Sequence, residues 1–446
     1  MATEGLETTC CVVGGGPAGV MLGYLLARAG VNVTVLEKHQ DFNRDFRGDT
    51  VHPSTLQVMH ELGLLEDFLK VPHQEMTHAS GVYGDFPFRT ADFSRLPTQC
   101  KFVALMPQWD FLNFLSSQGT RFSNFRLLMQ HECIELVRED GRVCGVEAHT
   151  PGGRVQIRAN LVIGCDGRHS TTRQAAGFEV IEHGVPIDVL WFRISRRATD
   201  PEQALGNINY GRVLVLINRG DYFQTGLLIR KGSFAEMQNN GLDHFRRIIR
   251  EIAPYLGDRV DELQDWKQIS LLTVQVNRLR QWYRPGLLCI GDAAHAMSPA
   301  GGVGINLAIQ DAVATANLLA DPLREGRITE WWLAQVQRRR EFPTRVTQQL
   351  QVFAHKGLQR VFQNPGSAIA PWPMKAVVSL PGVQHVMARV IGIGVRPEHI
   401  KGAKKESGFC LKKIAVGVGV AMGMAALAVG LVRKQRRRRS WRRAFA

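Results

Sequence analysis

Residues 10–38, CCVVGGGPAGVMLGYLLARAGVNVTVLEK, predict a strand, a glycine turn, a helix and a second strand. Gly14, Gly16 and Gly19 form a GxGxxG pattern directly after the apolar first strand. In this pattern the first glycine permits a tight turn, the second lets the backbone approach a pyrophosphate, and the third lets the helix pack closely on the strand. Glu37 ends the second strand, where its carboxylate can accept hydrogen bonds from ribose hydroxyls. The stretch predicts a dinucleotide site on a Rossmann-type α/β domain and leaves FAD and NAD open.

Two further motifs occur later in the chain. Residues 164–173 read GCDGRHSTTR, and residues 291–304 read GDAAHAMSPAGGVG after another apolar strand. Asp292 and His295 lie three residues apart, which suggests a charge-relay pair. In a turn from strand to loop, however, this spacing does not by itself bring the two side chains face to face.

The three motifs in this order resemble the FAD-dependent aromatic-ring hydroxylases, the single-component flavoprotein monooxygenases that are similar to p-hydroxybenzoate hydroxylase. The resemblance covers roughly residues 8–325. It implies FAD as the cofactor, with Asp166 and Gly167 near the pyrophosphate. It also implies that Arg47 approaches the FAD phosphates and that Gln108 lies near the cofactor at the start of a helix.

The third motif has physical properties that suit a flavin. Asp292 ends its strand where the ribityl hydroxyls would run, and a helix from residue 305 points its positive end at the flavin N1–C2=O edge. Proline gives a rigid turn, and glycines let backbone N–H groups approach a flat ring. The residues expected beside the ring are Pro299, Gly301, Gly302 and Gly304. The resemblance implies that His295 is mainly structural.

The resemblance also implies a reaction. No second GxGxxG pattern follows, so NAD(P)H has no Rossmann domain of its own and is expected to reduce the flavin transiently. O₂ then gives a flavin C4a-hydroperoxide, which hydroxylates or epoxidises an apolar or aromatic small molecule. An FAD-dependent reductase or halogenase on the same scaffold is an alternative, although the halogenase WxWxIP motif is absent from the sequence. A membrane- or nucleic-acid-binding protein with a structural flavin is another.

The expected fold class is α/β: a Rossmann-type FAD-binding domain similar to that of glutathione reductase, with an inserted mixed β-sheet substrate domain and C-terminal helices. The expected segments are 1–175 and 285–328 for the FAD-binding domain, 176–284 for the substrate domain, 329–400 for a helical region and 401–446 for a basic tail. Candidates for the substrate lining, each of which also fits ordinary strand packing, are Trp191, Arg193, Tyr222, Phe223 and Gln224.

Local patterns predict several further elements. Helices are expected over 54–69, 108–118 and 305–320, and a β-meander is expected over 126–165. A polar helical region, rich in Gln and Arg, is expected over 329–362.

The formal net charge of +15 is concentrated in the tail, because residues 401–446 hold 13 Lys/Arg and one Glu. A nearly neutral body makes nucleic acid an unlikely partner. Within 412–446, the 19 uncharged residues 414–432 are about long enough to span a membrane, but basic clusters flank both ends. A membrane span and a helix at an anionic membrane surface therefore both stay open. Eight cysteines without a CxxC pair favour a cytoplasmic protein without a metal site.

Overall fold

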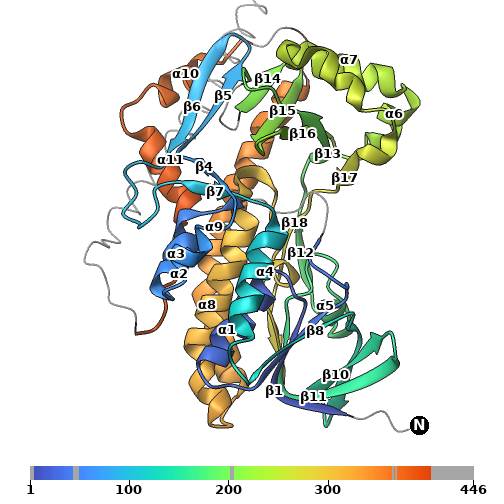
Figure 1. The fold of residues 1–446 in the computed structure, drawn as a ribbon, viewed down its shortest axis with the longest axis vertical. Coiled ribbons are helices and arrows are strands. Elements are labelled where there is room, and N and C mark those ends of the chain that lie inside the picture. Colours follow the sequence, from blue (N-terminus) through green and yellow to red (C-terminus); the bar gives the residue numbers. More distant parts are fainter. Residues whose placement is uncertain (1–4, 44–49, 201–204, 364–365, 367–368, 403–446) are drawn as a thin grey trace, which may run out of the picture.

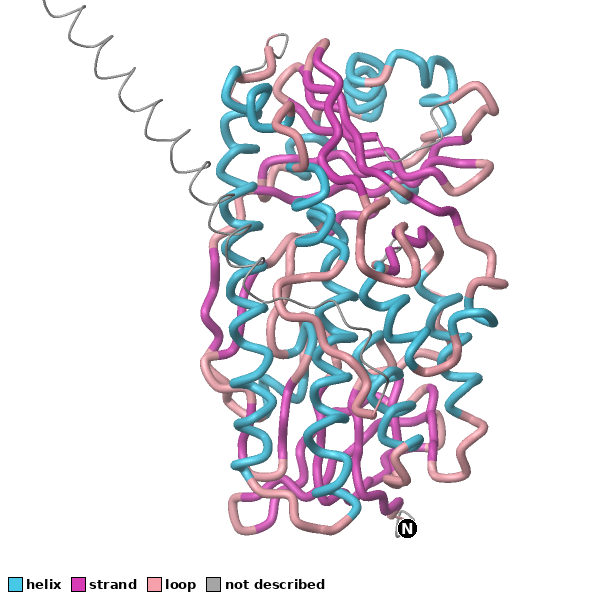
Figure 2. Tube along the Cα trace, turned by 90° about the vertical axis from the view of Figure 1, so that its left-hand side faces the viewer, coloured by secondary structure: helices cyan, strands magenta, loops and turns pink. Residues whose placement is uncertain are grey.

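The computed structural model describes residues 5–43, 50–200, 205–363, 366 and 369–402. Two large β-sheets lie toward opposite ends of its long axis, and the helices α8 (Val303–Arg324) and α9 (Glu330–Phe362) run along that axis (Figures 1 and 2). Arg47 and the tail segment 412–446 lie outside the described residues, so both stay predictions.

The first sheet contains the glycine turn. Its strands are β1 (Leu6–Val13), β2 (Val33–Glu37), β8 (Phe125–Met129), β9 (Glu132–Glu139), β10 (Arg142–Thr150), β11 (Gly153–Gly164), β19 (Tyr283–Arg284) and β20 (Leu287–Cys289). The order is β19-β20-β11-β1-β2-β8, and β10 joins β11 to β9. β1 is parallel to β2 and β11, and β11 is parallel to β20, so the carboxyl ends of β1, β11 and β20 meet at one edge. The expected Rossmann-type fold is confirmed.

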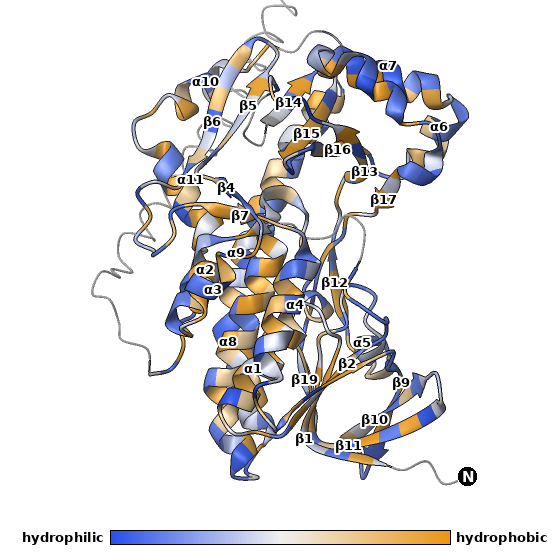
Figure 3. Ribbon diagram, in the orientation of Figure 1, coloured by the Kyte–Doolittle hydropathy of each residue, from blue (hydrophilic) through white to orange (hydrophobic). Residues whose placement is uncertain are grey.

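The β-meander expected over 126–165 is only partly present. β9, β10 and β11 are antiparallel neighbours, as a meander requires. β8 instead pairs in parallel with β2, with Val33 opposite Phe125. Helix α4 (Gln108–Gly119) directly precedes β8 and acts as a crossover, so β8 enters the sheet in the same direction as β2. Figure 3 shows apolar and polar residues alternating along β10 and β11, the pattern of strands with one face toward solvent.

The second sheet is almost entirely antiparallel. Its strands are β5 (His78–Tyr83), β6 (Phe86–Asp92), β13 (Ile187–Ser195), β14 (Leu205–Asn209), β15 (Arg212–Asn218), β16 (Tyr222–Arg230) and β17 (Ser270–Leu272). The order is β17-β13-β16-β15-β14-β5-β6. β5 and β6 come from a part of the chain well before residue 176, so this sheet is not formed by one continuous insertion. Two small sheets contain β3 (Thr50–Val51), β4 (Gln74–Met76) and β7 (Val103–Leu105), and β12 (Val180–His183) with β18 (Val276–Leu279).

The remaining helices cover the sheets. They are α1 (Pro17–Arg28), α2 (Pro53–Glu61), α3 (Leu65–Phe68), α5 (Thr171–Ala175), α6 (Phe234–Asn239), α7 (Leu242–Ile252), α10 (Trp372–Val378) and α11 (Val383–Gly392). The helix expected over 54–69 is divided into α2 and α3, because Gly63 takes a φ of +73° and the Leu64 N–H bonds back to the Met59 carbonyl, which ends α2. α8 is longer than the expected 305–320.

One helix of the described chain, Ala300–Arg324, has the length and composition of a membrane span. Its apolar window is 72% buried inside the protein, because it is the core helix α8.

A buried ionic network joins the third motif to both long helices. The Asp311 carboxylate on α8 lies 2.6 Å from His295 Nε2, 2.8 Å from Arg340 Nε on α9, and 3.0 Å from the Gly291 N–H that it accepts. Arg340 also reaches Glu398 at 3.5 Å. Burial alone raises the pKa of Asp311, but His295 and Arg340 outweigh burial and lower that pKa overall. His295 is therefore paired with Asp311 across the fold rather than with Asp292.

Arg340→Met should destabilise the protein by about 3–5 kcal/mol, because it removes the guanidinium that bonds the fully buried Asp311 carboxylate, whereas Glu398 keeps Arg339 at 2.7 Å. Arg338 is exposed on the same helix, and Arg338→Met should change stability by less than about 0.5 kcal/mol. Denaturant unfolding at neutral pH measures both. Equal stability of the two variants would show that the network does not hold the fold together.

Candidate cofactor and substrate site

All three sequence motifs meet at the carboxyl edge of the first sheet. A Cβ added at Gly14, after β1, would lie 2.5 Å from the Cys165 carbonyl after β11. A Cβ at Gly291, after β20, would lie 3.2 Å from Ala18 Cβ in α1. Motifs more than a hundred residues apart in sequence therefore pack directly against one another.

The glycine turn has one open side. Gly14 takes a φ of +107°, and a Cβ at Gly19 would lie 1.9 Å from the Gly14 carbonyl oxygen, so both positions require glycine for the backbone to pack. A Cβ at Gly16 would meet nothing within 4 Å. Gly16 also caps α1 without any side-chain hydrogen bond, which leaves that helix N-terminus accessible to an anion. The residues present thus fit a pyrophosphate at this turn.

Two acidic residues of the site accept hydrogen bonds from N–H and hydroxyl groups of the loops around them. The Glu37 carboxylate is 3% exposed and accepts hydrogen bonds from the N–H groups of Gly15 (3.1 Å) and His39 (3.0 Å). The Asp166 carboxylate accepts from Ser170 Oγ at 2.6 Å and from the Thr172 N–H at 2.9 Å. Both carboxylates therefore shape the loops that face the carboxyl edge.

Asp292 lies beside the second motif. Its Oδ2 is 3.6 Å from Arg168 Nη2, and its side chain is 30% exposed. Gly167, the neighbour of Arg168, takes a φ of +81° and has open space around its missing side chain. Arg173 is only 8% exposed and donates to the Arg168 carbonyl.

The loop of residues 296–302 adopts conformations that only glycine tolerates well. Gly301 and Gly302 take φ values of +81° and +62°, and the Gly302 N–H donates to the Pro299 carbonyl. A Cβ at Gly302 would lie 2.3 Å from Thr50 Oγ1, so this glycine is needed for packing against β3 as well as for its backbone angle. Gly304, in contrast, has open space where its side chain would be.

His52 lies behind the 296–302 loop. It is 1% exposed, and its Nδ1 bonds the Ile391 carbonyl of α11 at 2.9 Å. Burial lowers the pKa of His52 to about 4, so the ring is neutral near pH 7. His52 could not be identified from the sequence, because its burial depends on α11, more than three hundred residues away.

Helix α9 holds the same loop from the other side. Gln351 Nε2 donates to the carbonyls of Ser298 (2.9 Å) and Ala300 (3.1 Å), and Gln351 Oε1 accepts the Ser298 N–H (3.1 Å). Sequence analysis predicted only a polar helix here. Gln348, Gln351 and His355 recur at three- and four-residue spacing and are at most 6% exposed, so this polar face is turned inward.

Four of the five candidate lining residues share a face of the second sheet. Arg193 is directly opposite Gln224, and Trp191 is opposite Gly226, in the β13–β16 pairing. Phe223 points to the other face and packs in the core with Phe192 and Phe245, because side chains alternate along a strand. Phe223 therefore cannot line the same surface as Gln224.

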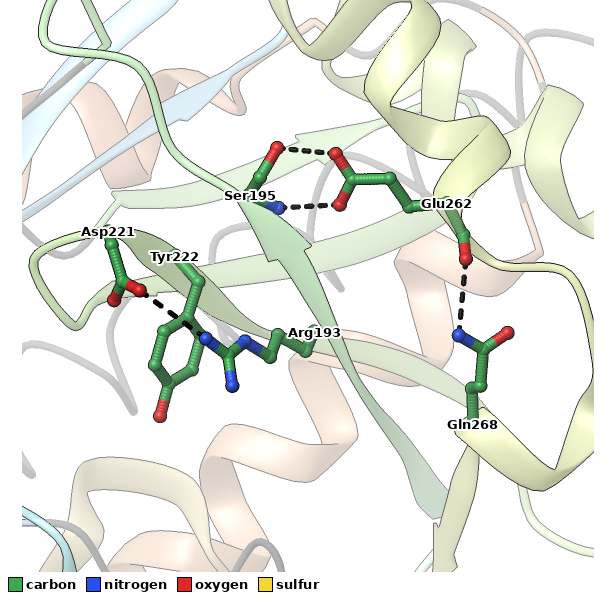
Figure 4. Close-up of a pocket in the computed structure, with 6 residues that line it drawn as sticks. All are labelled: Arg193, Ser195, Asp221, Tyr222, Glu262 and Gln268. Carbon is green, nitrogen blue, oxygen red and sulfur yellow. Dashed lines mark hydrogen bonds and ion pairs between the residues drawn. The ribbon is translucent and has the colours of Figure 1, made fainter.

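A cavity of about 240 Å³ lies where β13 ends and β16 begins. Figure 4 shows residues that line it. The Arg193 guanidinium lies 3.7 Å from the centre of the Tyr222 ring, and Ser195 bonds Glu262. The side chains of Arg193 and Asp221 are 58% and 80% exposed, so this cavity is polar and open to solvent.

Gln224 is buried and Trp191 and Tyr222 are half-buried, whereas Arg193 is exposed. Trp191 packs against the same buried cluster as Val352 and Phe362 of α9, and its Nε1 has no hydrogen-bond partner among the described residues. Gln224 is 5% exposed and accepts two hydrogen bonds from the Arg219 guanidinium.

Gln108 begins α4 shortly after β7, whose Leu105 pairs with Thr50 beside the 296–302 loop. Its side chain is partly buried. Within the described ranges, no group of three or more His, Cys, Asp or Glu side chains is arranged to hold a metal ion.

Comparison with known proteins identifies the cofactor. The family model described as an FAD binding domain matches residues 7–350. The 6-methylpretetramide 4-monooxygenase of Streptomyces rimosus is 32% identical over 406 residues, which cover 87% of this chain and 93% of that protein.

Solved structures share the fold. The p-nitrophenol 4-monooxygenase of Pseudomonas putida DLL-E4 matches with a TM-score of 0.67 at 19% identity, over 95% of this chain and 98% of that one. The flavin-dependent halogenase CmlS matches with a TM-score of 0.70 at 16% identity, over 94% of this chain and 77% of that one. At these identities the likeness concerns the fold alone. Together with the family match and the 32% identical relative, the three converging motifs show that this chain belongs to the FAD-dependent aromatic-ring hydroxylases and is an FAD-dependent monooxygenase.

Proposed function

We propose that the protein uses NAD(P)H and O₂ to hydroxylate an aromatic small molecule. The observation that carries this proposal is the convergence of the three motifs on one edge of the first sheet, between the N-termini of α1 and α8. Neither N-terminus has a side-chain cap, so both can face negative charge on a cofactor.

The proposal gives each residue of the edge a role toward FAD. Gly14, Gly16 and Gly19 admit the pyrophosphate, and Glu37 accepts from the adenosine ribose. The Asp166–Gly167 turn closes the pyrophosphate side, and Asp292 lies along the ribityl chain. Residues proposed to face the isoalloxazine ring are Pro299, Gly301, Gly302 and Gly304, with Arg47 and Gln108 at its approaches.

The substrate is proposed to lie between the 296–302 loop and the enclosed face of the second sheet. Ile391 of α11 packs against the buried cluster that contains Met297 of that loop, and also against a second cluster on which the sheet residue Ile217 packs, so α11 connects the loop to the sheet. This packing supports exclusion of water from the reacting centre. Trp191 and Gln224 are the proposed polar contacts, and an aromatic substrate is supported by relatives named for aromatic compounds, such as p-nitrophenol.

Bound FAD supplies two-electron chemistry with NAD(P)H and O₂. Overall, NAD(P)H, a proton, O₂ and an aromatic C–H give NAD(P)⁺, water and a phenol. The chain's own contribution is to hold the ring edge at the α8 N-terminus, to orient the substrate and to exclude solvent.

A screen of substituted phenols under ¹⁸O₂ tests this function. NAD(P)H oxidation should accelerate with a substrate, and mass spectrometry should find one ¹⁸O atom in the product, with the peroxide released measured alongside. A reductase would reduce the substrate without ¹⁸O incorporation, and a halogenase would add chloride or bromide instead. Purified protein without flavin absorbance near 450 nm would contradict the proposal altogether.

Gly16→Val tests where the cofactor lies. A Cβ added at Gly16 meets no protein atom within 4 Å, so the unfolding midpoint of the apoprotein should stay unchanged. The same side chain would occupy the proposed pyrophosphate position, so the FAD dissociation constant should rise at least about tenfold. Gly184 is exposed and, like Gly16, has no atoms near its Cβ position, so Gly184→Val is the matched control. Unchanged FAD affinity in Gly16→Val would exclude this placement.

We also propose that the tail binds an anionic membrane surface and holds a cytoplasmic enzyme there. Its support is the sequence: residues 414–432 are uncharged and mostly apolar, and Lys/Arg clusters flank them. The full chain should co-sediment with vesicles containing phosphatidylglycerol, and a chain lacking 412–446 should stay in the supernatant. Equal sedimentation of the two proteins would contradict the proposal.

A further inference from the structure

We propose that Gln351 and His355 of α9 are positioning residues for the flavin, acting through the 296–302 loop. This inference rests on the proposed placement of FAD, because it is that placement that puts the loop against the ring. Neither side chain is proposed to touch the substrate or the cofactor.

The 296–302 loop has little regular structure to satisfy its backbone. Its only helical part is the short 3₁₀ turn Ala300–Gly302, and it contains two residues with positive φ. Buried backbone N–H and C=O groups without partners are costly, so such a loop needs hydrogen bonds from elsewhere. Its conformation is therefore set by whatever supplies those bonds.

Gln351 supplies three of them with one side chain. Its amide accepts from the Ser298 N–H and donates to the Ser298 and Ala300 carbonyls, which fixes the backbone on both sides of Pro299. Gln348 extends the series, because its Nε2 donates to the carbonyls of Ala296 (3.2 Å) and Asn277 (2.6 Å).

His355 holds the side chain of Ser298. Its Nε2 lies 2.9 Å from Ser298 Oγ, which in turn accepts the Ala300 N–H at 3.2 Å. His355 is 2% exposed, and burial lowers its pKa, which favours the neutral ring. Gln348, Gln351 and His355 thus contact successive parts of the loop from one face of α9.

The same helix also contacts the second sheet. Val352, Leu358 and Phe362 of α9 pack in the cluster that includes Trp191 and Leu228. One rigid helix therefore fixes the loop proposed to face the flavin and supports the sheet proposed to face the substrate. Movement of the loop relative to the sheet is restricted because both are attached to α9.

Gln351→Met tests the inference, because methionine has a similar length and removes all three hydrogen bonds without adding charge. Gln349→Met is the matched control, since Gln349 is exposed on the same helix. Gln351→Met should raise the FAD dissociation constant about tenfold, shift the flavin absorption spectrum and midpoint potential, and increase the peroxide released per NAD(P)H oxidised. Gln349→Met should match the wild type in all four measurements.

Ser298→Ala is the milder second variant, because it removes only the hydroxyl that joins His355 to the loop. It should weaken FAD binding about threefold and shift the midpoint potential in the same direction, with an unchanged circular dichroism spectrum. Ser298→Ala decides the matter if Gln351→Met does not fold.

The two proposals fail differently. Wild-type protein that binds no FAD contradicts the proposed function. Wild-type protein that binds FAD, with Gln351→Met or Ser298→Ala identical to Gln349→Met in affinity, spectrum and potential, contradicts only the role of α9.

Discussion

The position of the site depends on the hydrogen bonds and ion pairs that the buried Asp311 carboxylate makes. A fully buried carboxylate is tolerated only when other groups compensate the lost hydration, and here His295, Arg340 and the Gly291 N–H do so. These partners come from the end of β20, the loop after it and α9. Neutralising one charge therefore requires the first sheet, α8 and α9 to be in their native arrangement at the same time.

The position of α9 in turn controls the 296–302 loop. Because five of the seven residues of this loop are alanine, glycine or proline, its own sequence imposes little on its conformation beyond the positive φ values of Gly301 and Gly302. The polar face of α9 provides the missing hydrogen bonds, and Thr50 bonds the Gly302 carbonyl from the opposite side. The loop is thus held between two elements that lie some fifty residues after it and two hundred and fifty before it.

The motifs that were predictable from sequence share a physical property. Gly19 of the first motif packs against the Gly14 carbonyl, and that contact is specified within six residues. Asp166 likewise bonds Ser170 and Thr172 nearby. Because these contacts join residues only a few positions apart, they require particular residue types at a short fixed spacing, and these positions could be recognised without knowing the fold.

Other features of the site depend on tertiary contacts, and the sequence indicated the wrong partner for them or none. The proximity of Asp292 and His295 in sequence suggested a pair, yet His295 bonds Asp311 on the following helix, because the turn after β20 directs the imidazole into the core. Tyr222 and Phe223 are adjacent aromatic residues that face opposite sides of the second sheet. The sequence predicted a polar helix over 329–362 without a partner, whereas the amides of Gln348 and Gln351 bond the backbone of the 296–302 loop.

By itself the sequence determined the α/β class, the three cofactor motifs and the family, because glycine turns, strand periodicity and their order are properties of short segments. Only the tertiary structure decided which partners the buried polar groups take. It brought β5 and β6 into the second sheet, His52 onto α11 and Gln351 onto the loop. These choices are made by satisfying buried charges and backbone groups across long sequence separations, and no local spacing in the chain encodes them.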